Sequence, residues 1–542
     1  MIAKEFFIAE IGLYQPGGSS ETVELTWGAT PWASLALDPL PVEATGTLYV
    51  SDDGYTSLDG DAIGLVVYPP LISGGFEIDR TLDLVPGRTP ASSSFGSIRI
   101  FDSNGQISSL MRTWNIFAQT LTVKRGVKEW DETRGYWPCP SYADLAPVFT
   151  GLSGTWTQTE TEIVIPVNGA TYWLDQPIQT ELYDGTGTYE GNAALKGTPK
   201  PMTRGIVYNV APVLIDPTNR IYQYNDGPGT VVALYERGAT GITFQSDTTD
   251  LYAGSTSAGQ YRTDNSRGLF QLGSDPVGTI TVDATGEFLV AGAQTVAATI
   301  ALYLLSEDLS VPSDFIDTSS FSSAASTYAY DAGVYFGPDD IPSGRDAVSR
   351  LLASFGASLI AKRTGELAIL ALRAPPAGST SSFAFGQHNI ISIEPVPLPP
   401  ELIPPPYRIR VAYQHNHTVQ NDVSDAATSA HRQFVAVPDR YSQFVDTDVL
   451  ASYRRPNDLE PFGGALDDAA DAETVAEDLG ALWSVPRRTY AVEVPVSVGV
   501  GLDVGDLVRV TYPIDILRNG ARGRIVREQF RSDQSITFLV LI

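Results

Sequence analysis

The stretch Thr161-Glu-Ile-Val-Ile-Pro-Val167 is followed directly by Asn168-Gly169. Successive side chains of an extended chain point to opposite faces, so Ile163, Ile165 and Val167 share one face. This spacing predicts a half-buried β-strand. Asn-Gly is the dipeptide that two-residue hairpin turns favour most, so we expect the chain to turn back on itself here.

Short runs of the same kind recur between turn signals over roughly the first third of the chain. Glycine and proline are frequent, at 49 and 37 residues, which is typical of a chain with many turns. Strands are predicted at Ile63 to Tyr68, Ser97 to Phe101 and Thr120 to Lys124. Turns are predicted at Asn104-Gly105 and Arg125-Gly126. The first part of the chain is therefore expected to be a β-structure.

A glycine-rich region from Tyr183 to about Gly286 carries further short strands, such as Val231 to Tyr235, and two helical patterns follow it. The first helix is expected to begin after Ser343 as its cap and to stop at Gly356. Its apolar residues recur at helical spacing and are Val348, Leu351, Leu352 and Phe355. The second helix is expected over Asp468 to Trp483. Its apolar stripe consists of Ala472, Val475, Ala476, Leu479, Leu482 and Trp483.

Between and after these helices the sequence indicates β-structure again. Ser358 to Ala361 and Glu366 to Leu372 predict a hairpin. Pro395 to Pro406 contains seven prolines in twelve residues, so it should be stiff, extended and unable to lie inside a sheet. The segment from Thr489 to Ile542 should be β again, with a turn at Asp503-Val-Gly-Asp506. These patterns predict a mainly β (α+β) protein.

The chain has 542 residues, of which 43% are hydrophobic and 18% are charged. This is globular composition, and the length suggests three or four domains. Lys and Arg total 35 against 63 Asp and Glu, a formal net charge of -28. Such a surface repels phosphate, which argues against nucleic-acid binding by charge neutralisation and against anionic membranes.

Cys139 is the only cysteine, so an intrachain disulfide and a cysteine-based zinc or iron–sulfur site are excluded. The start of the chain, Met1 to Ile8, reads as a strand rather than a signal peptide. The longest apolar stretch, Val290 to Leu305, is too short to span a bilayer and predicts no stable membrane insertion. We expect the protein to be made and assembled in a cytoplasm.

No motif carries a complete set of catalytic residues, so no catalytic residue and no cofactor are predicted. Gly185-Thr-Gly187-Thr-Tyr-Glu-Gly191 resembles a dinucleotide fingerprint but has one residue too many and no βαβ unit around it. Gly254-Ser-Thr-Ser-Ala-Gly259 has the wrong spacing for a nucleophilic serine. Asp52-Asp53-Gly54 and Asp59-Gly60-Asp61 are faintly calcium-like, but a solvated turn is the better interpretation.

His415-Asn-His417 is the best candidate for metal binding, because alternate residues of a strand could bring both imidazoles to one ion. No third ligand is evident, so no metal site is predicted and an ordinary polar strand or loop is preferred.

Seven of the eight tryptophans lie before residue 174, and we expect them to be core or interface anchors rather than sugar-stacking platforms. They are Trp27, Trp32, Trp114, Trp130, Trp137, Trp156 and Trp173. Paired carboxylates of the kind that glycosidases use stay possible, since 63 acidic residues form many pairs by chance.

Several stretches resemble the baseplate hub proteins of long-tailed phages, the tail-tip family that includes the hubs of gene transfer agents. The strongest is Leu195-Lys-Gly-Thr-Pro-Lys-Pro-Met202 with Tyr208-Asn-Val-Ala-Pro212 and Tyr222-Gln-Tyr-Asn-Asp-Gly227. The others, in the same order as in the family, are Tyr68–Leu71 with Phe76–Leu82 and Phe95–Asp102, Gly278–Asp283, the helix at 343–356 with Gly365, and Leu502–Val510.

The resemblance implies two tube-like β-barrel or sandwich domains per chain, with smaller β and α+β insert domains. We expect a first tube-like domain at residues 1–180, an inserted β-rich domain at 181–289 and a helix-containing domain at 290–394. A proline-rich linker at 395–406 and a second tube-like C-terminal domain at 407–542 would follow.

The resemblance also implies a function. Three such chains would form a ring that adapts a hexameric tail tube to a trimeric fibre or spike. The expected partners are two further copies of the chain, the distal tail or tail tube protein, the fibre or central spike protein and the tape measure protein. DNA would pass through the channel without specific binding, and the protein would be structural rather than an enzyme. The alternatives are a carbohydrate-binding receptor-recognition protein and, less favoured, a cell-wall or polysaccharide hydrolase.

Overall fold

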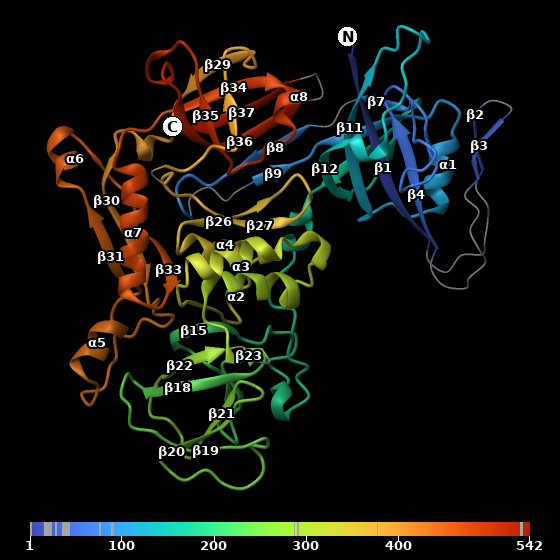
Figure 1. The fold of residues 1–542 in the computed structure, drawn as a ribbon. Helices are drawn as coiled ribbons and strands as arrows, with labels where there is room; N and C mark the ends of the chain where they lie inside the picture. The colour runs from blue at the N-terminus through green and yellow to red at the C-terminus, as the bar shows by residue number, and fades with distance from the viewer. Residues whose placement is uncertain are drawn as a thin grey trace.

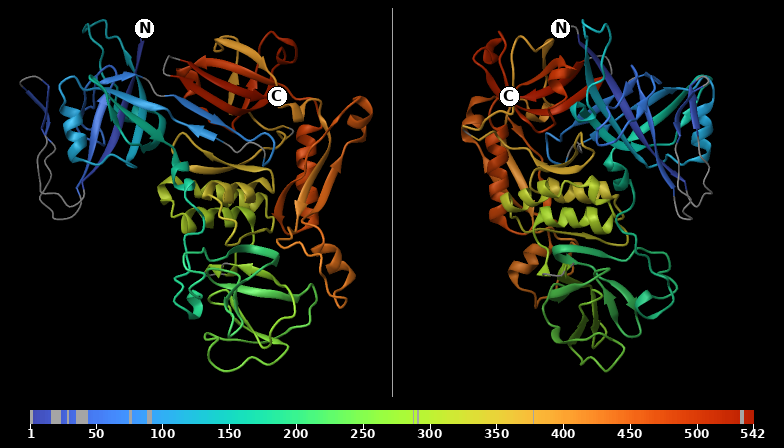
Figure 2. Two further views of the ribbon diagram at one scale, coloured as in Figure 1. Left: turned by 180° about the vertical axis from the view of Figure 1, so that it is seen from behind. Right: turned by 45° about the vertical axis from the view of Figure 1, so that its right-hand side comes forward.

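The computed structural model describes residues 3–15, 24–27, 30–34, 44–74, 77–87, 92–286, 288–289, 292–376, 378–531 and 535–542. These residues form a mainly β, multidomain protein, as the sequence predicts. Figure 1 shows two β-domains side by side at one end of the molecule, a helical layer beneath one of them and a further β-domain at the opposite end. Figure 2 shows the same order of layers from behind and from the side.

The N-terminal domain is built on an eight-stranded antiparallel sheet with the path β4-β1-β11-β12-β14-β10-β7. Apolar residues of its strands, together with Leu110, Met111 and Trp114 of helix α1 (Gln106–Thr113) and its end, are buried in the core. Its members are β1 (Ala3–Gln15), β4 (Ala44–Ser51), β7 (Ile72–Gly74), β10 (Ser97–Phe101), β11 (Thr120–Glu129), β12 (Ala146–Ser153), β14 (Glu162–Asn168) and, beside β14, β13 (Thr157–Gln158). The predicted strands at 97–101, 120–124 and 161–167 are confirmed.

Two turns predicted in this domain are wrong. In each case the glycine allows an aromatic ring to pack against the backbone. Arg125-Gly126 lies inside β11, where a Cβ on Gly126 would come within 2.3 Å of the Phe6 ring. Asn168-Gly169 does not turn a hairpin: Gly169 is extended, with φ −80°, and a Cβ there would lie 2.5 Å from Phe95. A short 3₁₀ helix, Ala170–Asp175, follows it.

Two other predictions in this region are only partly correct. Asn104-Gly105 does form a turn, but it leads into α1, which the sequence did not predict. The buried carboxylate of Asp102 accepts hydrogen bonds from the N–H groups of Ile107 and Ser108, and so holds the start of that helix. Of the strand expected at 63–68, only β6 (Val67–Tyr68) forms, pairing with β5 (Tyr55–Thr56).

The glycine-rich region folds into two antiparallel sheets at the far end of the molecule, apart from one parallel pair. One is four-stranded, with the order β18-β22-β15-β25, and the other is five-stranded, with the order β16-β17-β21-β20-β19. The first contains β15 (Met202–Val210), β18 (Gly229–Glu236), β22 (Ile280–Gly286) and β25 (Gly333–Phe336). The second contains β16 (Val213–Asp216), β17 (Ile221–Gln223), β19 (Thr243–Asp247), β20 (Gln260–Asp264) and β21 (Leu269–Leu272).

A helical layer connects this region to the rest of the protein (Figure 1). It consists of α2 (Ala297–Tyr303), α3 (Thr318–Thr327) and α4 (Gly344–Ala353), with the predicted hairpin of β26 (Ala357–Ala361) and β27 (Leu367–Ala371) on top. Helix α4 confirms the predicted start, because the Ser343 side chain accepts a hydrogen bond from the N–H of Asp346 at 3.1 Å. Gly356, with φ +66°, ends the turn after the helix.

A smaller sheet with one long helix stands beside this layer. Its strands are β30 (Pro406–Tyr413), β31 (Arg440–Val445), β32 (Asn457–Asp458) and β33 (Phe462–Leu466), with the short helices α5 (Ser429–Val435) and α6 (Thr447–Ser452) in its connections. The predicted helix is α7 (Ala469–Trp483), capped by Asp468, and every residue of its predicted apolar stripe is buried. Gly480 lets the helix approach Phe444 of β31, since a Cβ there would lie 2.5 Å from the ring.

The second eight-stranded sheet is C-terminal, with the path β28-β35-β36-β37-β34-β29. It contains β28 (Phe383–Phe385), β29 (Ser392–Val396), β34 (Thr489–Pro495), β35 (Leu507–Val510), β36 (Ala521–Arg531) and β37 (Ser535–Leu541), with the short helix α8 (Val496–Gly499). The proline-rich segment leaves its edge strand β29 and reaches β30 through one 3₁₀ turn, Pro400–Leu402. Pro406 is the first residue of β30, a position that proline tolerates in a strand.

Two strands of this C-terminal sheet come from the N-terminal part of the chain. β8 (Ile78–Thr81) pairs antiparallel with β36, and β9 (Ser92–Ser94) pairs with β8. In this register Arg80 lies opposite Glu528. The N-terminal part of the chain therefore completes the C-terminal sheet, through main-chain hydrogen bonds between segments that are very distant in the sequence.

An ion cluster is buried at this junction. The Glu528 carboxylate, 0% exposed, accepts hydrogen bonds from the guanidinium groups of Arg80 and Arg363. Arg80 also pairs with Asp503 at 2.5 Å, and Arg363 donates to the carbonyl of Val148 at 3.2 Å. The cluster thus joins β8, the β26–β27 hairpin, the C-terminal sheet and strand β12 of the N-terminal sheet.

Replacing Glu528 by Gln should destabilise the protein strongly, because it leaves two buried guanidinium groups without their shared counter-charge. We expect a loss of about 3–5 kcal/mol in the free energy of unfolding. Chemical denaturation followed by tryptophan fluorescence would measure it.

A matched control is Arg345→Ala, which removes the half-buried partner of the exposed Asp175. That change should cost about 1 kcal/mol or less. Equal stability of the Glu528→Gln and control variants would contradict the importance assigned to the cluster.

Candidate functional site

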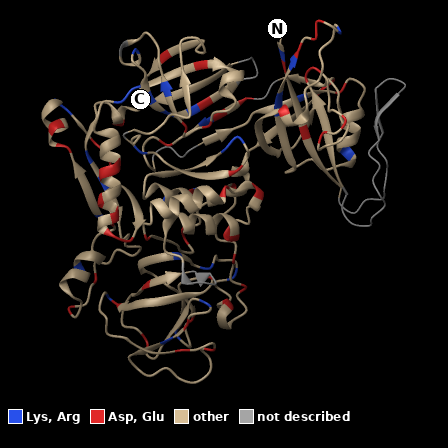
Figure 3. Ribbon diagram, viewed as in Figure 1, with Lys and Arg blue, Asp and Glu red and all other residues tan. Residues whose placement is uncertain are grey.

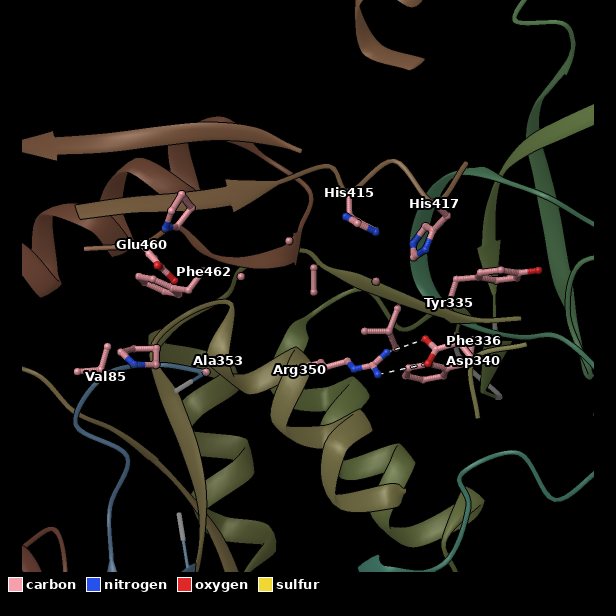
Figure 4. Close-up of a pocket in the computed structure, with 18 residues that line it drawn as sticks. Val85, Tyr335, Phe336, Asp340, Arg350, Ala353, His415, His417, Glu460 and Phe462 are labelled. Atoms are coloured by element: carbon pink, nitrogen blue, oxygen red, sulfur yellow. Dashed lines mark hydrogen bonds and ion pairs between the residues drawn. The ribbon is translucent and has the colours of Figure 1, made fainter. Parts of the chain in front are cut away.

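The candidate site is a pocket of about 450 Å³ where five segments of the chain meet. Its walls are β25 of the four-stranded sheet, the end of α4, strand β33 and the loop after β30. Residues 85–87, which lie between β8 and β9, close one side. Figure 4 shows His415 and His417 above this space, and Arg350 and Asp340 on the opposite wall.

The two histidines that the sequence singled out do lie together. Their ring centroids are 4.7 Å apart and the ring planes are nearly perpendicular, at 86°. Both imidazoles point into the pocket, with ring nitrogens facing each other (Figure 4). The segment is a loop and not a strand, and the backbone leaves the extended conformation at Gln414, with φ +47°.

Each histidine has a distinct environment. The Nδ1 atom of His415 lies 2.7 Å from a carboxylate oxygen of Asp439, so this nitrogen carries the proton and Nε2 is left to face the pocket. The side chain of His415 is 41% exposed. Burial, and to a smaller extent the neighbouring His415, lowers the pKa of His417 to about 3, so its imidazole is neutral at physiological pH.

The residue between them fixes their orientation. Asn416 is 2% exposed. Its side-chain N–H groups donate to the carbonyls of Val435 and Val437 at 3.0 and 2.9 Å. Its side-chain oxygen accepts from Asn209 at 2.6 Å. Because Asn416 is held from several sides, the two imidazoles are presented by a rigid loop.

The opposite wall carries one compensated ion pair. Arg350 of α4 donates to Asp340 at 2.7 and 3.3 Å, so neither charge is left uncompensated (Figure 4). Phe462, Tyr335 and Phe336 supply apolar surface between the two walls.

The sequence identifies the two histidines but not the residues that hold them in place. Asp439 lies 24 positions from His415, and the pairing depends on the fold of β30 and β31 rather than on a local motif. Among the described residues, no group of three or more His, Cys, Asp or Glu side chains is arranged to hold a metal ion.

The tryptophans give little support to a sugar-binding cleft. Trp114 is buried, and Trp130, Trp137, Trp156 and Trp173 are half-buried. Trp130 and Trp137 contact each other edge to face at 5.3 Å, and Trp173 packs on Phe315 at 4.7 Å. The side chains of Trp27 and Trp32 lie outside the described residues, as does Phe76.

A second pocket, of about 360 Å³, lies between the four-stranded sheet and helix α5. In the described part of the chain, Asp283 is the one carboxylate that lines it. It accepts hydrogen bonds from the Asn209 N–H and the Tyr235 hydroxyl, both at 2.8 Å. Burial nevertheless raises the pKa of Asp283. A hydrolase that uses two carboxylates would need a second one beside it.

In two other motifs that the sequence singled out, the polar groups already bind other groups of the protein. In the loop at 185–191, the N–H groups of Gly185 and Gly187 donate to carbonyls of the same loop and cannot cradle a phosphate. Asp53 pairs with Lys4 and Lys128, and Asp52 accepts from the Phe7 N–H at 2.8 Å. The carboxylates of Asp52 and Asp53 therefore already have partners within the protein.

No helix in the described part of the chain has both the length and the apolar character needed to cross a membrane.

No family model matches this chain, and no curated protein matches it. Three of the solved structures that are similar to it are phage tail or virion proteins. The 43 kDa tail protein of prophage MuSo2 from Shewanella oneidensis is 11% identical at a TM-score of 0.32, covering 90% of this chain and 98% of that one. A chain of the virion of a native gene transfer agent particle is 14% identical at a TM-score of 0.38, covering 64% and 84%.

The third is the prophage tail protein gp18 from Listeria monocytogenes EGD-e, 9% identical at a TM-score of 0.25, covering 86% and 94%. Similarities at these identities and TM-scores carry neither a fold nor a function.

The raised pKa of Asp283 should make its contribution to the stability of the folded protein larger at low pH than at neutral pH. Its pKa in the folded protein is raised above the ordinary value of 3.8, so the folded state holds this proton more tightly than the unfolded chain. The stability gained is present at low pH and is lost as the pH rises through the raised value. Asp283→Asn should remove this loss, which calorimetry between about pH 4 and pH 8 would detect as a flatter dependence of Tm on pH.

Asp275→Asn is the matched control, because that side chain is 86% exposed. An Asp283→Asn variant whose Tm follows pH as steeply as the control does would contradict the assignment.

Proposed function

We propose that this chain is the hub subunit of a phage tail tip, a structural protein of the virion without enzymatic activity. Three copies would form a ring around the channel through which DNA leaves the particle. The observation that carries the proposal is the presence of two large sheets in one chain, each eight-stranded and mostly antiparallel, side by side at one end of the molecule (Figure 1). Two such domains in each of three chains give six similar units, which match a hexameric tube.

The way in which the two sheets are joined supports a ring subunit. Strand β8 adds to β36, and the Arg80–Glu528–Arg363 cluster lies buried between the domains. A ring that transmits force along a tail requires its neighbouring units to keep a fixed angle. Main-chain pairing combined with a buried ion cluster gives that rigidity within one chain.

The stretches that resemble hub proteins lie at structurally important places. The run 195–202 leads into β15, and the segment 222–227 starts in β17 and ends in the loop before β18. The stretch Leu502–Val510 forms the turn and strand β35 of the C-terminal sheet. Asp503 in that turn is a partner of Arg80 in the buried cluster.

The proposed partners are two further copies of the chain, the distal tail or tail tube protein, a tail fibre or central spike protein and the tape measure protein. The three remaining parts of the chain project away from the paired sheets and would provide the contacts with fibre or spike (Figure 2). Assembly would take place in the host cytoplasm, with the mature location at the tail tip. DNA would pass the ring without specific binding.

The second candidate function is carbohydrate recognition. Trp130 and Trp137 pair on one loop, and Tyr136 between them is 46% exposed, which is the observation in its favour. Glycan binding by the isolated chain that is lost in Trp137→Ala would support this alternative. Cleavage of peptidoglycan or polysaccharide, lost on changing one carboxylate pair, would support a hydrolase instead.

Imaging of the intact particle tests the hub proposal directly. We expect three copies at the tail tip around a channel, with both large sheets of each copy in the ring. A single copy in the assembled particle, or a ring made without the C-terminal sheet, would contradict the proposal.

The wall of the channel should carry mainly Asp, Glu and neutral polar side chains, since transiting DNA has one negative charge per about 1.7 Å of duplex. The arginine-rich segment from Arg487 to Arg531 should contact protein instead. Within one chain Arg527 already pairs with Asp79 at 2.6 Å, and Arg524 donates to the Gly505 carbonyl at 2.7 Å. Acidic and basic residues occur over all parts of the chain (Figure 3), so only the assembled ring identifies those that line the channel.

A count of charged side chains facing the channel is the measurement. More Lys and Arg than Asp and Glu at that surface would contradict the expectation.

A further inference from the structure

The pocket between α4, β25 and β33 presents two imidazoles that the proposed hub function does not use. His415 and His417 follow strand β30 and point into the same space, with centroids 4.7 Å apart (Figure 4). Perpendicular rings at this separation allow one nitrogen of each to reach a common point at about 2.0–2.1 Å, the usual zinc–nitrogen distance.

The hydrogen bond between His415 and Asp439 fixes the imidazole ring, as is usual for a histidine that binds a metal ion. Its Nδ1–H donates to Asp439 at 2.7 Å, which leaves the lone pair of Nε2 available for a ligand. A carboxylate behind a ligating histidine fixes the ring and makes its free nitrogen a better donor. Asn416 holds the backbone between the two rings through hydrogen bonds to Val435, Val437 and Asn209.

The charges nearby do not oppose a cation. Arg350, the arginine of this pocket, is already neutralised by Asp340 at 2.7 Å. The pocket is large enough, at about 450 Å³, for an ion to keep several water molecules. Two imidazole nitrogens favour zinc, nickel and copper over calcium or magnesium, which prefer oxygen ligands.

We propose that His415 and His417 bind one divalent ion of the zinc, nickel and copper class, with water or an oxygen ligand from a neighbouring molecule in the other positions. Such a site has two ligands from this chain and open coordination positions. Asp439 is a positioning residue for His415 and does not touch the ion.

Calorimetric titration of the full-length protein with ZnCl₂ tests the proposal. We expect one Zn²⁺ per chain, with the site lost in His415→Ala and in His417→Ala. Asp439→Asn should keep the site but weaken binding about tenfold or more. The matched control is the exposed His388→Ala, which should bind as the unchanged protein does.

A second measurement separates a defined site from loose association. Cu²⁺ added at one equivalent should give an electron paramagnetic resonance spectrum with coupling to two imidazole nitrogens, reduced to one or none in either His variant. His417→Gln provides a further test in case His417→Ala fails to fold, as judged by circular dichroism without metal.

Several outcomes would overturn the proposal. They are the absence of stoichiometric Zn²⁺ binding, binding that His415→Ala leaves unchanged, and binding that His388→Ala removes instead. None of them bears on the oligomeric ring, so the hub proposal and the metal site stand or fall separately.

Discussion

Glu528 is a carboxylate with no access to water, and it is stable there only because two arginines from distant parts of the chain share it. Removing a charge from water costs several kcal/mol, and the cost is recovered only if partners and hydrogen bonds are complete. Arg80 comes from the N-terminal part of the chain and Arg363 from the β26–β27 hairpin. The cluster is therefore complete only when three regions of the protein are in their final positions.

Much of the remaining architecture depends on that arrangement. With β8 paired to β36, the hairpin β26–β27 lies between the C-terminal sheet and the helical layer (Figure 1). The helical layer in turn carries the four-stranded sheet: Arg204 of β15 pairs with Asp308, just after α2, at 2.7 Å. The pocket that holds His415 and His417 forms where these parts meet the smaller sheet, so its geometry follows from the same junction.

Local patterns in the sequence predict the structure correctly where the residues that decide it lie within one segment. The sequence predicts helix α7 together with its buried stripe, because the spacing of the apolar residues lies within one segment. The patterns failed where a residue serves a distant neighbour. The sequence predicts turns at Gly126 and Gly169, yet each glycine leaves room for a phenylalanine ring, Phe6 or Phe95, that the local sequence does not reveal.

The sequence by itself determined the mainly β class, the helices α4 and α7, the exclusion of an intrachain disulfide and the strongly acidic character. It also identified His415 and His417 as the best candidates for metal binding. Only the tertiary structure decided that β8 joins the last sheet, that Glu528 is shared by two arginines and that Asp439 orients His415. The physical reason is that side-chain periodicity specifies which face of a segment is buried, whereas every strand edge offers the same main-chain groups. Which edges meet is decided by the packing of the whole chain.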